Sequence, residues 1–329
     1  MKITITGGTG FIGSRLALRS REMGHDVTIL GQVNTPAEED NLNELKAGNI
    51  RVLIGAVTDR EKTQEAVADA DIVFHLAAAQ HEANVPDQHF RDVNVEGTRQ
   101  LIEASIESGV KRFVYGSTIG VYGSALDGQI DEQSLQRPDN IYGITKAEAE
   151  KLVQEYADRI PATIIRISET YGPGDRRLLK LFKAIKKRVF FMIGKGLNKH
   201  QLIYVDDLID GLYVAALSDT AIGETFVLAG SEVLTTNEMA RAISGAVNTP
   251  VRNFRAPLWF FMLTAIILET LLKPLGIQPP LHRRRMDFFR KSFYFSRDKV
   301  EHKLGFEPKT SFEDGTKLTA EWYRKNKLL

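Results

Sequence analysis

The stretch MKITITGGTGFIG, residues 1–13, decides the fold. Residues 2–6 alternate isoleucine with threonine, as a strand does, and a helical pattern begins at Phe11. Gly7, Gly10 and Gly13 lie three apart where the strand passes into the helix. Glycine costs backbone entropy, so such a cluster marks a place where the main chain must approach another group closely. A glycine-rich turn from strand to helix exposes N–H groups to a pyrophosphate, and we therefore predict a dinucleotide-binding turn rather than an ordinary tight turn.

Strand-like and helical segments alternate after this turn. Further strands are predicted at 25–30, 51–57, 71–78, 112–117 and 162–167, and helices at 11–23, 63–70, 93–108 and from Tyr142 onward. Strands alternating with helices form parallel βαβ units with right-handed crossovers. We expect an α/β fold, a Rossmann-like doubly wound parallel sheet with its cleft at the carboxyl ends of the strands.

The regular alternation of strands and helices ends after Tyr171. Residues 178–190 have the pattern of a basic amphipathic helix, 202–217 read as a strand entering a helix, and the chain from Glu232 is mostly helical with proline breaks. We predict a dinucleotide-binding domain at 1–171, to which 199–230 return. Residues 172–198 and 231–329 would form a smaller, mostly helical substrate lobe.

Composition excludes several classes of function. The 329 residues contain no cysteine, which rules out disulfides, thiolate metal sites and a catalytic thiol. The net charge of +1 provides no field for nucleic acid, and the basic run at 186–188 lacks interleaved aromatic residues. His75, His81 and His89 do not have the spacing of a metal site, so we predict no metal. A cytoplasmic homodimer acting on a small-molecule substrate is the expectation.

The longest apolar stretch is PLWFFMLTAIILETLL, residues 257–272. Glu269 interrupts it, and it falls short of the roughly 20 apolar residues that a membrane-spanning helix needs. We therefore expect no spanning segment. A helix of the core or of a cap over the cleft is the favoured interpretation, with peripheral contact to a membrane surface as the alternative.

Tyr142 and Lys146 are the candidate catalytic pair. Their spacing of four places both on one face of a helix. A tyrosine normally loses its proton near pH 10, and a neighbouring ammonium together with a positively charged nicotinamide ring would lower that pKa. Tyr142 would then act as general acid or base at a carbinol or carbonyl oxygen, and Thr118, just after a predicted strand, offers a hydroxyl to orient it.

With these residues the chain resembles the extended short-chain dehydrogenase/reductases, also called the NAD-dependent epimerase/dehydratase family. The resemblance runs nearly end to end, through TGGTGFIG, HLAA (75–78), NVEGT (94–98), STIGVYG (117–123), YGITK (142–146), YGPGD (171–175) and YVDDL (204–208). It implies that Thr118, Tyr142 and Lys146 form the catalytic triad. It also implies hydride transfer between a nicotinamide and a secondary alcohol or ketone.

The resemblance further implies a set of cofactor-binding residues. These are Gly7, Gly10, Phe11, Ile12, Gly13, Gln32, Ala56, Val57, Leu76, Ala77, Ala78, Asn94, Tyr142 and Lys146. The cofactor is NAD or NADP: Gly31 and Gln32 stand where an acid would hold the adenosine ribose, and Arg15 is a candidate partner for a ribose 2′-phosphate.

Departures from the family pattern concern the substrate. Ala56 replaces an acid that many members carry, and Glu169 and His200 stand where nucleotide-sugar members often have asparagine and arginine. Arginine binds a diphosphate bidentately, and Arg176, Arg177, Lys195 and Arg283–Arg285 are candidate substitutes.

We expect an NAD(P)-dependent epimerase or reductase of a nucleotide sugar. Dehydration needs a further acid/base pair, which Ile119 and Gly120 do not supply. A 3β-hydroxysteroid-type or other lipid-alcohol dehydrogenase is the alternative, suggested by the apolar stretch. A non-catalytic nucleotide-sensing protein is a second alternative, which the intact triad disfavours.

Overall fold

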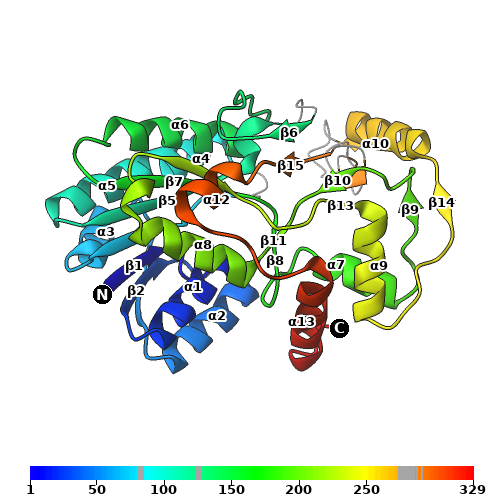
Figure 1. Cartoon of the computed structure of the whole chain (residues 1–329), viewed down its shortest axis with the longest axis horizontal. Coiled ribbons are helices and arrows are strands. Elements are labelled where there is room, and N and C mark those ends of the chain that lie inside the picture. Colours follow the sequence, from blue (N-terminus) through cyan, green and yellow to red (C-terminus); the bar gives the residue numbers. More distant parts are fainter. Residues whose placement is uncertain (81–84, 124–127, 273–285, 287, 290–291) are drawn as a thin grey trace.

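Seven parallel strands form the central sheet of the computed structural model, in the order β3-β2-β1-β4-β5-β7-β12 (Figure 1). The strands are β1 (Lys2–Thr6), β2 (Asp26–Gly31), β3 (Arg51–Ile54), β4 (Ile72–His75), β5 (Arg112–Thr118), β7 (Ala162–Ile167) and β12 (Thr225–Leu228). The structure describes residues 1–329 except 81–84, 124–127, 273–285, 287 and 290–291. The prediction of a doubly wound parallel sheet is confirmed.

Helices cover both faces of this sheet. On one face lie α1 (Phe11–Glu22), α2 (Pro36–Ala47) and α8 (Val205–Leu217), which share a core with Ile3, Ile5 and Phe74. On the other lie α3 (Arg60–Val67), α5 (Gly97–Glu107) and α6 (Ile141–Glu155), which pack on Val73 and Phe113. Successive strand residues thus serve opposite faces, as the period of two requires.

Several shorter helical segments lie between these elements or after them. The short helix α4 (Asp87–Arg91) continues into a π-helical turn, η1 (Asp92–Glu96), ahead of α5. A 3-10 turn, η2 (Ile119–Tyr122), follows β5, and another, η3 (Asp219–Ala221), precedes β12. Near the C-terminus, α12 (Asp298–Leu304) contributes Val300 to the same core as α1 and α8.

A second group of helices packs beside the sheet domain, at the right of Figure 1. It consists of α7 (Leu179–Lys186), α9 (Thr236–Ala246) and α13 (Phe312–Lys325), whose shared core includes Phe182, Ile243 and Tyr323. Short paired strands link the two parts: β8 (Thr170–Tyr171) with β11 (Ile203–Tyr204), β9 (Met192–Ile193) with β14 (Arg255–Ala256), β10 (Lys199–His200) with β13 (Leu234–Thr235), and β6 (Gln129–Ile130) with β15 (Tyr294–Phe295). The proposed domain boundaries stay predictions.

The apolar stretch is helix α10 (Leu258–Leu272). Of the two forms of the favoured expectation, a helix of the core is wrong, and a cap over the cleft stays a prediction. Only Ala265 and Glu269 are buried. Large apolar side chains along it are exposed: Trp259 at 67%, Phe260 at 51%, Leu263 at 51%, Ile266 at 43%, Ile267 at 48% and Leu271 at 62%. No helix in the described ranges has the length and apolar character needed to cross a bilayer.

Candidate active site

The strand order reverses between β1 and β4, which are neighbours in the sheet. Ligands of open α/β sheets bind outside the carboxyl ends of the strands at such a point. The glycine turn follows β1 here, and the segment from Leu76 to Ala79 follows β4. The leading sequence motif and the predicted cofactor residues after β4 therefore meet at one edge of the sheet.

The glycine turn is held close against its surroundings. Gly7 has φ of +69°, and a Cβ there would lie 2.8 Å from the Ala77 nitrogen. A Cβ on Gly13 would lie 2.2 Å from the Gly7 carbonyl oxygen, whereas a Cβ on Gly10 would meet only that oxygen, at 3.2 Å. Gly7 and Gly13 are therefore required by the backbone of the turn, where a side chain would collide. At Gly10 the missing side chain leaves free space next to the turn.

The first turn of α1 is open to an anion. Gly10 caps the helix with no side-chain hydrogen bond, and the first turn contains no acidic residue. The leading N–H groups of a helix have no partner within the helix, and they carry a partial positive charge. A pyrophosphate would satisfy them, so this turn fits the dinucleotide that the motif predicts.

The end of β2 shows why glycine stands where an acid is usual. A Cβ on Gly31 would lie 2.6 Å from the Thr9 hydroxyl, and that hydroxyl donates to the Gln32 carbonyl at 2.6 Å. Gln32 is exposed. Arg15 is engaged elsewhere, in a two-bonded ion pair with Asp206 at 2.8 and 2.9 Å, so the geometry gives no support to its predicted role with a 2′-phosphate.

The remaining predicted cofactor residues lie around this edge with different exposures. Phe11, Ile12 and Leu76 are half-buried and pack on the core between the sheet and α1. Ala56, Ala77 and Ala78 are half-buried, whereas Val57 is buried with Leu30 and Leu53. Their contacts with a cofactor stay predictions.

Asn94 connects the segment after β4 to the catalytic helix. It is buried in the π-helical turn, and its amide accepts from the Ala79 N–H at 2.8 Å. Its nitrogen donates to the Ala79 carbonyl at 3.2 Å and to the Thr145 hydroxyl at 2.9 Å. Because Thr145 precedes Lys146 on α6, Asn94 fixes this helix relative to the predicted cofactor segment.

Thr118 and Tyr142 come together from different elements. Thr118 ends β5, and Tyr142 lies in the first turn of α6, which Asn140 caps by accepting from the Gly143 N–H at 3.1 Å. Burial raises the pKa of Tyr142 to about 12, while the hydrogen bond to the Thr118 side chain and the charge of Arg177 act in the opposite direction. The phenol is therefore protonated at neutral pH.

Lys146 lies one turn further along α6 and is 1% exposed. Its Nζ sits 4.0 Å from the centre of the Tyr115 ring. Burial lowers the pKa of Lys146 to about 7, against the charge of Glu150, which raises it. In the structure burial disfavours the charged form of both side chains. The lowering of the Tyr142 pKa by the ammonium together with a bound nicotinamide stays a prediction.

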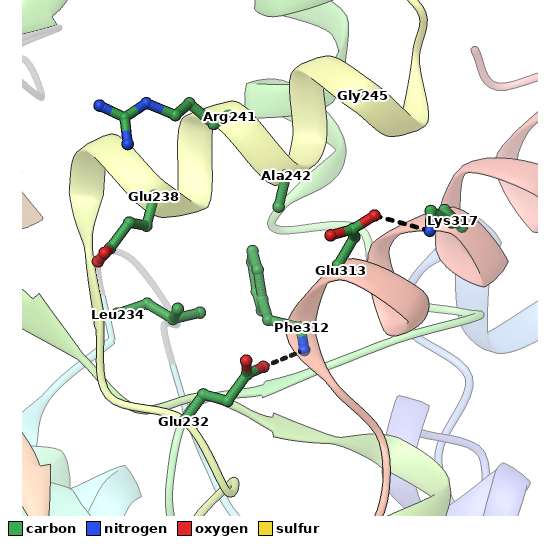
Figure 2. A pocket seen from close by; sticks show the side chains of 9 residues that line it. All are labelled: Glu232, Leu234, Glu238, Arg241, Ala242, Gly245, Phe312, Glu313 and Lys317. Carbon is green, nitrogen blue, oxygen red and sulfur yellow. Dashed lines mark hydrogen bonds and ion pairs between the residues drawn. The ribbon is translucent and has the colours of Figure 1, made fainter.

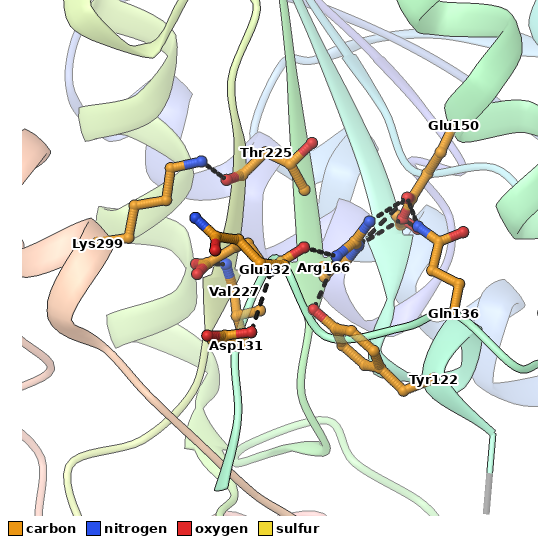
Figure 3. Close-up of polar contacts among 11 residues, drawn as sticks. Tyr122, Asp131, Glu132, Gln136, Glu150, Arg166, Thr225, Val227 and Lys299 are labelled. Atoms are coloured by element: carbon orange, nitrogen blue, oxygen red, sulfur yellow. Dashed lines mark hydrogen bonds and ion pairs between the residues drawn. The ribbon is translucent and has the colours of Figure 1, made fainter. Parts of the chain in front are cut away.

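Sequence reasoning missed the buried network behind Lys146, which Figure 3 shows. Glu150 lies one turn beyond Lys146 and receives hydrogen bonds from Arg166 on β7 at 2.7 and 3.0 Å. Ser117 donates to the same carboxylate at 2.5 Å and Gln136 at 2.7 Å. The available signal was weak: a lysine and a glutamate one turn apart on a helix usually mark a surface.

Arg166 extends this network to η2 and to the segment that follows β6. Its guanidinium donates to the Tyr122 hydroxyl at 2.8 Å and to the Glu132 carbonyl at 2.9 Å, and Glu132 accepts from the Val227 N–H (Figure 3). The side chains of Arg166 and Glu150 are 5% and 1% exposed. The ion pair thus anchors α6 to β7, one helical turn beyond Lys146.

The structure also places the residues that depart from the family pattern. His200 is buried, bonds to Thr236 at 3.1 Å and lies 4.0 Å from the Glu169 carboxylate; burial lowers its pKa. Arg176 pairs with Asp40 at 3.0 Å. Arg177 is the cation whose charge reaches Tyr142, which makes it the candidate of most interest.

The other basic residues and histidines considered for the site differ in exposure and in their contacts. Lys195 is exposed and its carbonyl accepts from Arg255 at 2.7 Å. His75 is buried and bonded to Thr6 and Thr98 at 2.6 and 2.9 Å; burial lowers its pKa, so it is a neutral core histidine. Arg283–Arg285 and His81 lie outside the described residues.

A separate pocket of about 350 Å³ lies between α9 and α13 (Figure 2). Phe312 and Leu234 extend into it, and Glu313 forms an ion pair with Lys317 at its rim. None of the predicted triad or cofactor residues lines it. This pocket is therefore distinct from the candidate active site.

Comparisons with known proteins agree with this geometry. A model described as the NAD dependent epimerase/dehydratase family matches residues 3–229. The dTDP-D-glucose 4,6-dehydratase of Mus musculus is 29% identical over 338 residues, covering 99% of this chain and 89% of the relative. A 3-beta-hydroxysteroid dehydrogenase of Mycolicibacterium neoaurum is 29% identical over 325 residues, covering 93% and 87%. The solved UDP-glucose 4-epimerase of Thermotoga maritima, in complex with UDP-glucose, is 25% identical with a TM-score of 0.78, over 99% of each chain.

Proposed function

Because the chain belongs to the NAD-dependent epimerase/dehydratase family, we propose that it oxidises or reduces a secondary alcohol or ketone of a nucleotide sugar. The observation that carries this proposal is the meeting of Thr118 and Tyr142 at the end of β5, with Lys146 one helical turn away. Both catalytic elements adjoin the edge of the sheet that bears the open glycine turn.

The chain's own residues supply binding and proton transfer. The first turn of α1 would hold the pyrophosphate of NAD(P), and Lys146 would hold the nicotinamide ribose. When bound, NAD(P) supplies hydride exchange at its nicotinamide ring. Tyr142 then gives a proton to the substrate oxygen during reduction or takes it during oxidation, and the Thr118 hydroxyl orients that oxygen.

The protonated phenol suits the reductive direction. Burial holds the pKa of Tyr142 at about 12, so the general acid is present in its active form throughout the neutral range. In the oxidative direction the phenol must first be deprotonated, and the positive charge of an oxidised nicotinamide favours this. We therefore expect the oxidative rate to rise with pH more steeply than the reductive rate.

Epimerisation or simple redox chemistry is favoured over dehydration. Dehydration requires a further acid and base at the substrate, and the residues that follow Thr118 in the η2 turn are Ile119 and Gly120. The similarity to the mouse dehydratase supports a nucleotide-sugar substrate, as does that to the Thermotoga epimerase. Arg177 is our candidate for contact with the substrate diphosphate.

A lipid alcohol is the alternative substrate. The Mycolicibacterium relative supports it, as do Glu169 and His200, which provide a negative and a neutral side chain near YGPGD. A homodimer in the cytoplasm stays part of the proposal, to be checked by sedimentation and by cell fractionation.

A ligand panel tests the substrate class. The melting temperature would be measured with NAD or NADP, alone and together with UDP-, GDP- and dTDP-sugars or sterols. A ligand stabilises only the state that binds it, by about 2.7 kcal/mol at 100 times its Kd. A rise with a nucleotide sugar supports the proposal. A rise with sterols alone favours the alternative, and no rise with either dinucleotide contradicts both.

A further inference from the structure

Helix α10 presents an apolar face that is exposed in the part of the chain that the structure describes. Trp259, Phe260, Leu263, Ile266, Ile267 and Leu271 recur at helical spacing and are all 43% or more exposed; we call them the α10 face. Phe254, 61% exposed, extends this surface just ahead of the helix. Exposed apolar patches of this kind mark interaction surfaces.

The opposite side of α10 is packed, so the orientation of the helix is fixed. Leu258, Phe261, Met262 and Ala265 pack with Ile193 of β9, and the Phe191 and Phe261 rings lie 5.9 Å apart. Strand β14, which pairs with β9, leads directly into the helix (Figure 1). The α10 face therefore points away from the protein on a supported helix.

The charges around α10 identify its partner. The segments that contain β9 and β14, residues 186–199 and 251–257, carry seven exposed basic residues and no acidic one, in a chain of net charge +1. Two of the seven flank the start of α10: Arg255 on β14 donates to the carbonyl of Lys195, which follows β9. The basic residues are Lys186, Lys187, Arg188, Lys195, Lys199, Arg252 and Arg255. The single acid of α10, Glu269, is buried. An apolar face beside basic residues is complementary to an anionic lipid surface, where cations meet headgroups and aromatic rings enter the interface.

A second copy of the chain fits this surface less well. A two-fold dimer places the same patch against itself, so these basic segments would face their own copies. Like charges brought together across an interface oppose binding. We infer that α10 and its flanking basic residues dock the protein peripherally on an anionic phospholipid bilayer. At 15 residues α10 would lie in the interface plane rather than cross the bilayer.

Tryptophan fluorescence tests this directly, because the chain has only Trp259 and Trp322. In a Trp322→Phe protein, vesicles of phosphatidylglycerol with brominated acyl chains are expected to quench and blue-shift Trp259. The matched Trp259→Phe protein, which retains Trp322 on α13, is expected to show no quenching. Absence of quenching of Trp259 would overturn the inference.

Vesicle sedimentation separates the apolar and electrostatic contributions. Leu263→Gln/Ile267→Gln is expected to weaken binding at least tenfold, and the control Leu135→Gln/Leu217→Gln, at exposed leucines elsewhere, to leave it unchanged. Lys195→Gln/Arg255→Gln is expected to weaken it about 30-fold at low salt, and Lys46→Gln/Lys151→Gln much less. Equal binding to neutral phosphatidylcholine vesicles would contradict the electrostatic part.

One result would assign the face to a protein partner instead. If Leu263→Gln/Ile267→Gln dissociated a dimer while the parent protein ignored vesicles, α10 would be a contact between copies and the inference would fall. The melting temperature of each variant shows that it is folded. These assays need neither cofactor nor sugar. A negative result for membrane binding is therefore distinguishable from a failure of the proposed function.

Discussion

Replacing Lys146 by methionine is expected to stabilise the protein at neutral pH while it abolishes turnover. The amine is 1% exposed, and burial lowers its pKa from 10.5 to about 7. The unfolded chain, in which the lysine is solvated, therefore binds more protons than the fold between these two values. Below pH 7 the free energy of unfolding of the wild type is lowered by the full cost of burying this amine. That cost decreases as the pH rises toward 10.5, so stability recovers.

The size of the effect follows from the two pKa values. At ~1.4 kcal/mol per pKa unit, burying this amine costs roughly 4 kcal/mol at pH 7 and roughly 2 kcal/mol at pH 9. The contact with the Tyr115 ring offsets about 1–2 kcal/mol of this. A net gain of about 2–3 kcal/mol remains at pH 7. With an unfolding entropy of ~2.1 cal/mol/K for each of 329 residues, Tm rises by roughly 3–4 °C.

Calorimetry of wild type and Lys146→Met at pH 7 and pH 9 measures both quantities. The stability advantage of the variant is expected to shrink by about 2 kcal/mol between these pH values. Lys151→Met, at an exposed position on the same helix, is the control and is expected to change stability by less than about 0.5 kcal/mol at either pH. A variant less stable than wild type at pH 7, or an advantage that does not depend on pH, would refute the reasoning.

Three further predictions concern the supports of the site. Gly13→Ala is expected to abolish NAD binding in calorimetric titration, because a Cβ at this position would collide with the Gly7 carbonyl. The control Gly245→Ala, where a Cβ meets nothing within 4 Å, is expected to bind NAD as the wild type does. Equal binding by both variants would contradict the tight turn. Arg166→Leu removes the cation of this buried ion pair and leaves the Glu150 carboxylate with only the Ser117 and Gln136 hydrogen bonds, so urea unfolding should show a loss of about 3–5 kcal/mol. A loss below about 1 kcal/mol would show the pair to be dispensable. Arg15→Gln is expected to leave the NADP Kd within about twofold, since the side chain is engaged in its ion pair, and a tenfold weakening would restore its role with the 2′-phosphate.

The sheet was predictable because its signals are local. Period-two apolar runs and a glycine turn between strand and helix need no knowledge of distant contacts, and the predicted strands lie at or within three residues of β1, β2, β4, β5 and β7. The helix α2 was missed because it buries only Leu45 and so has little apolar periodicity. Its Thr35–Glu38 capping box was the signal that sequence reasoning left unused.

The environment of the site was harder to predict because it depends on contacts across the fold. The spacing of Tyr142 and Lys146 predicts a shared helix face, which α6 provides. It does not predict that Lys146 is buried, and burial raises the pKa of Tyr142 and lowers that of Lys146. The exposure of α10 was missed for a related reason. An apolar sequence indicates that burying the helix would be favourable, but it does not indicate whether the rest of the fold packs against it.

The central claim is that Tyr142 exchanges a proton with a substrate oxygen beside a bound nicotinamide. Its most direct test is single-turnover hydride transfer in wild type and Tyr142→Phe, followed by the absorbance of reduced nicotinamide with the sugar that stabilises the protein most. The account predicts a rate about 10²–10⁴ times lower in the variant, with the Kd for the dinucleotide unchanged within about threefold. An unchanged rate, or loss of dinucleotide binding together with the rate, would contradict it.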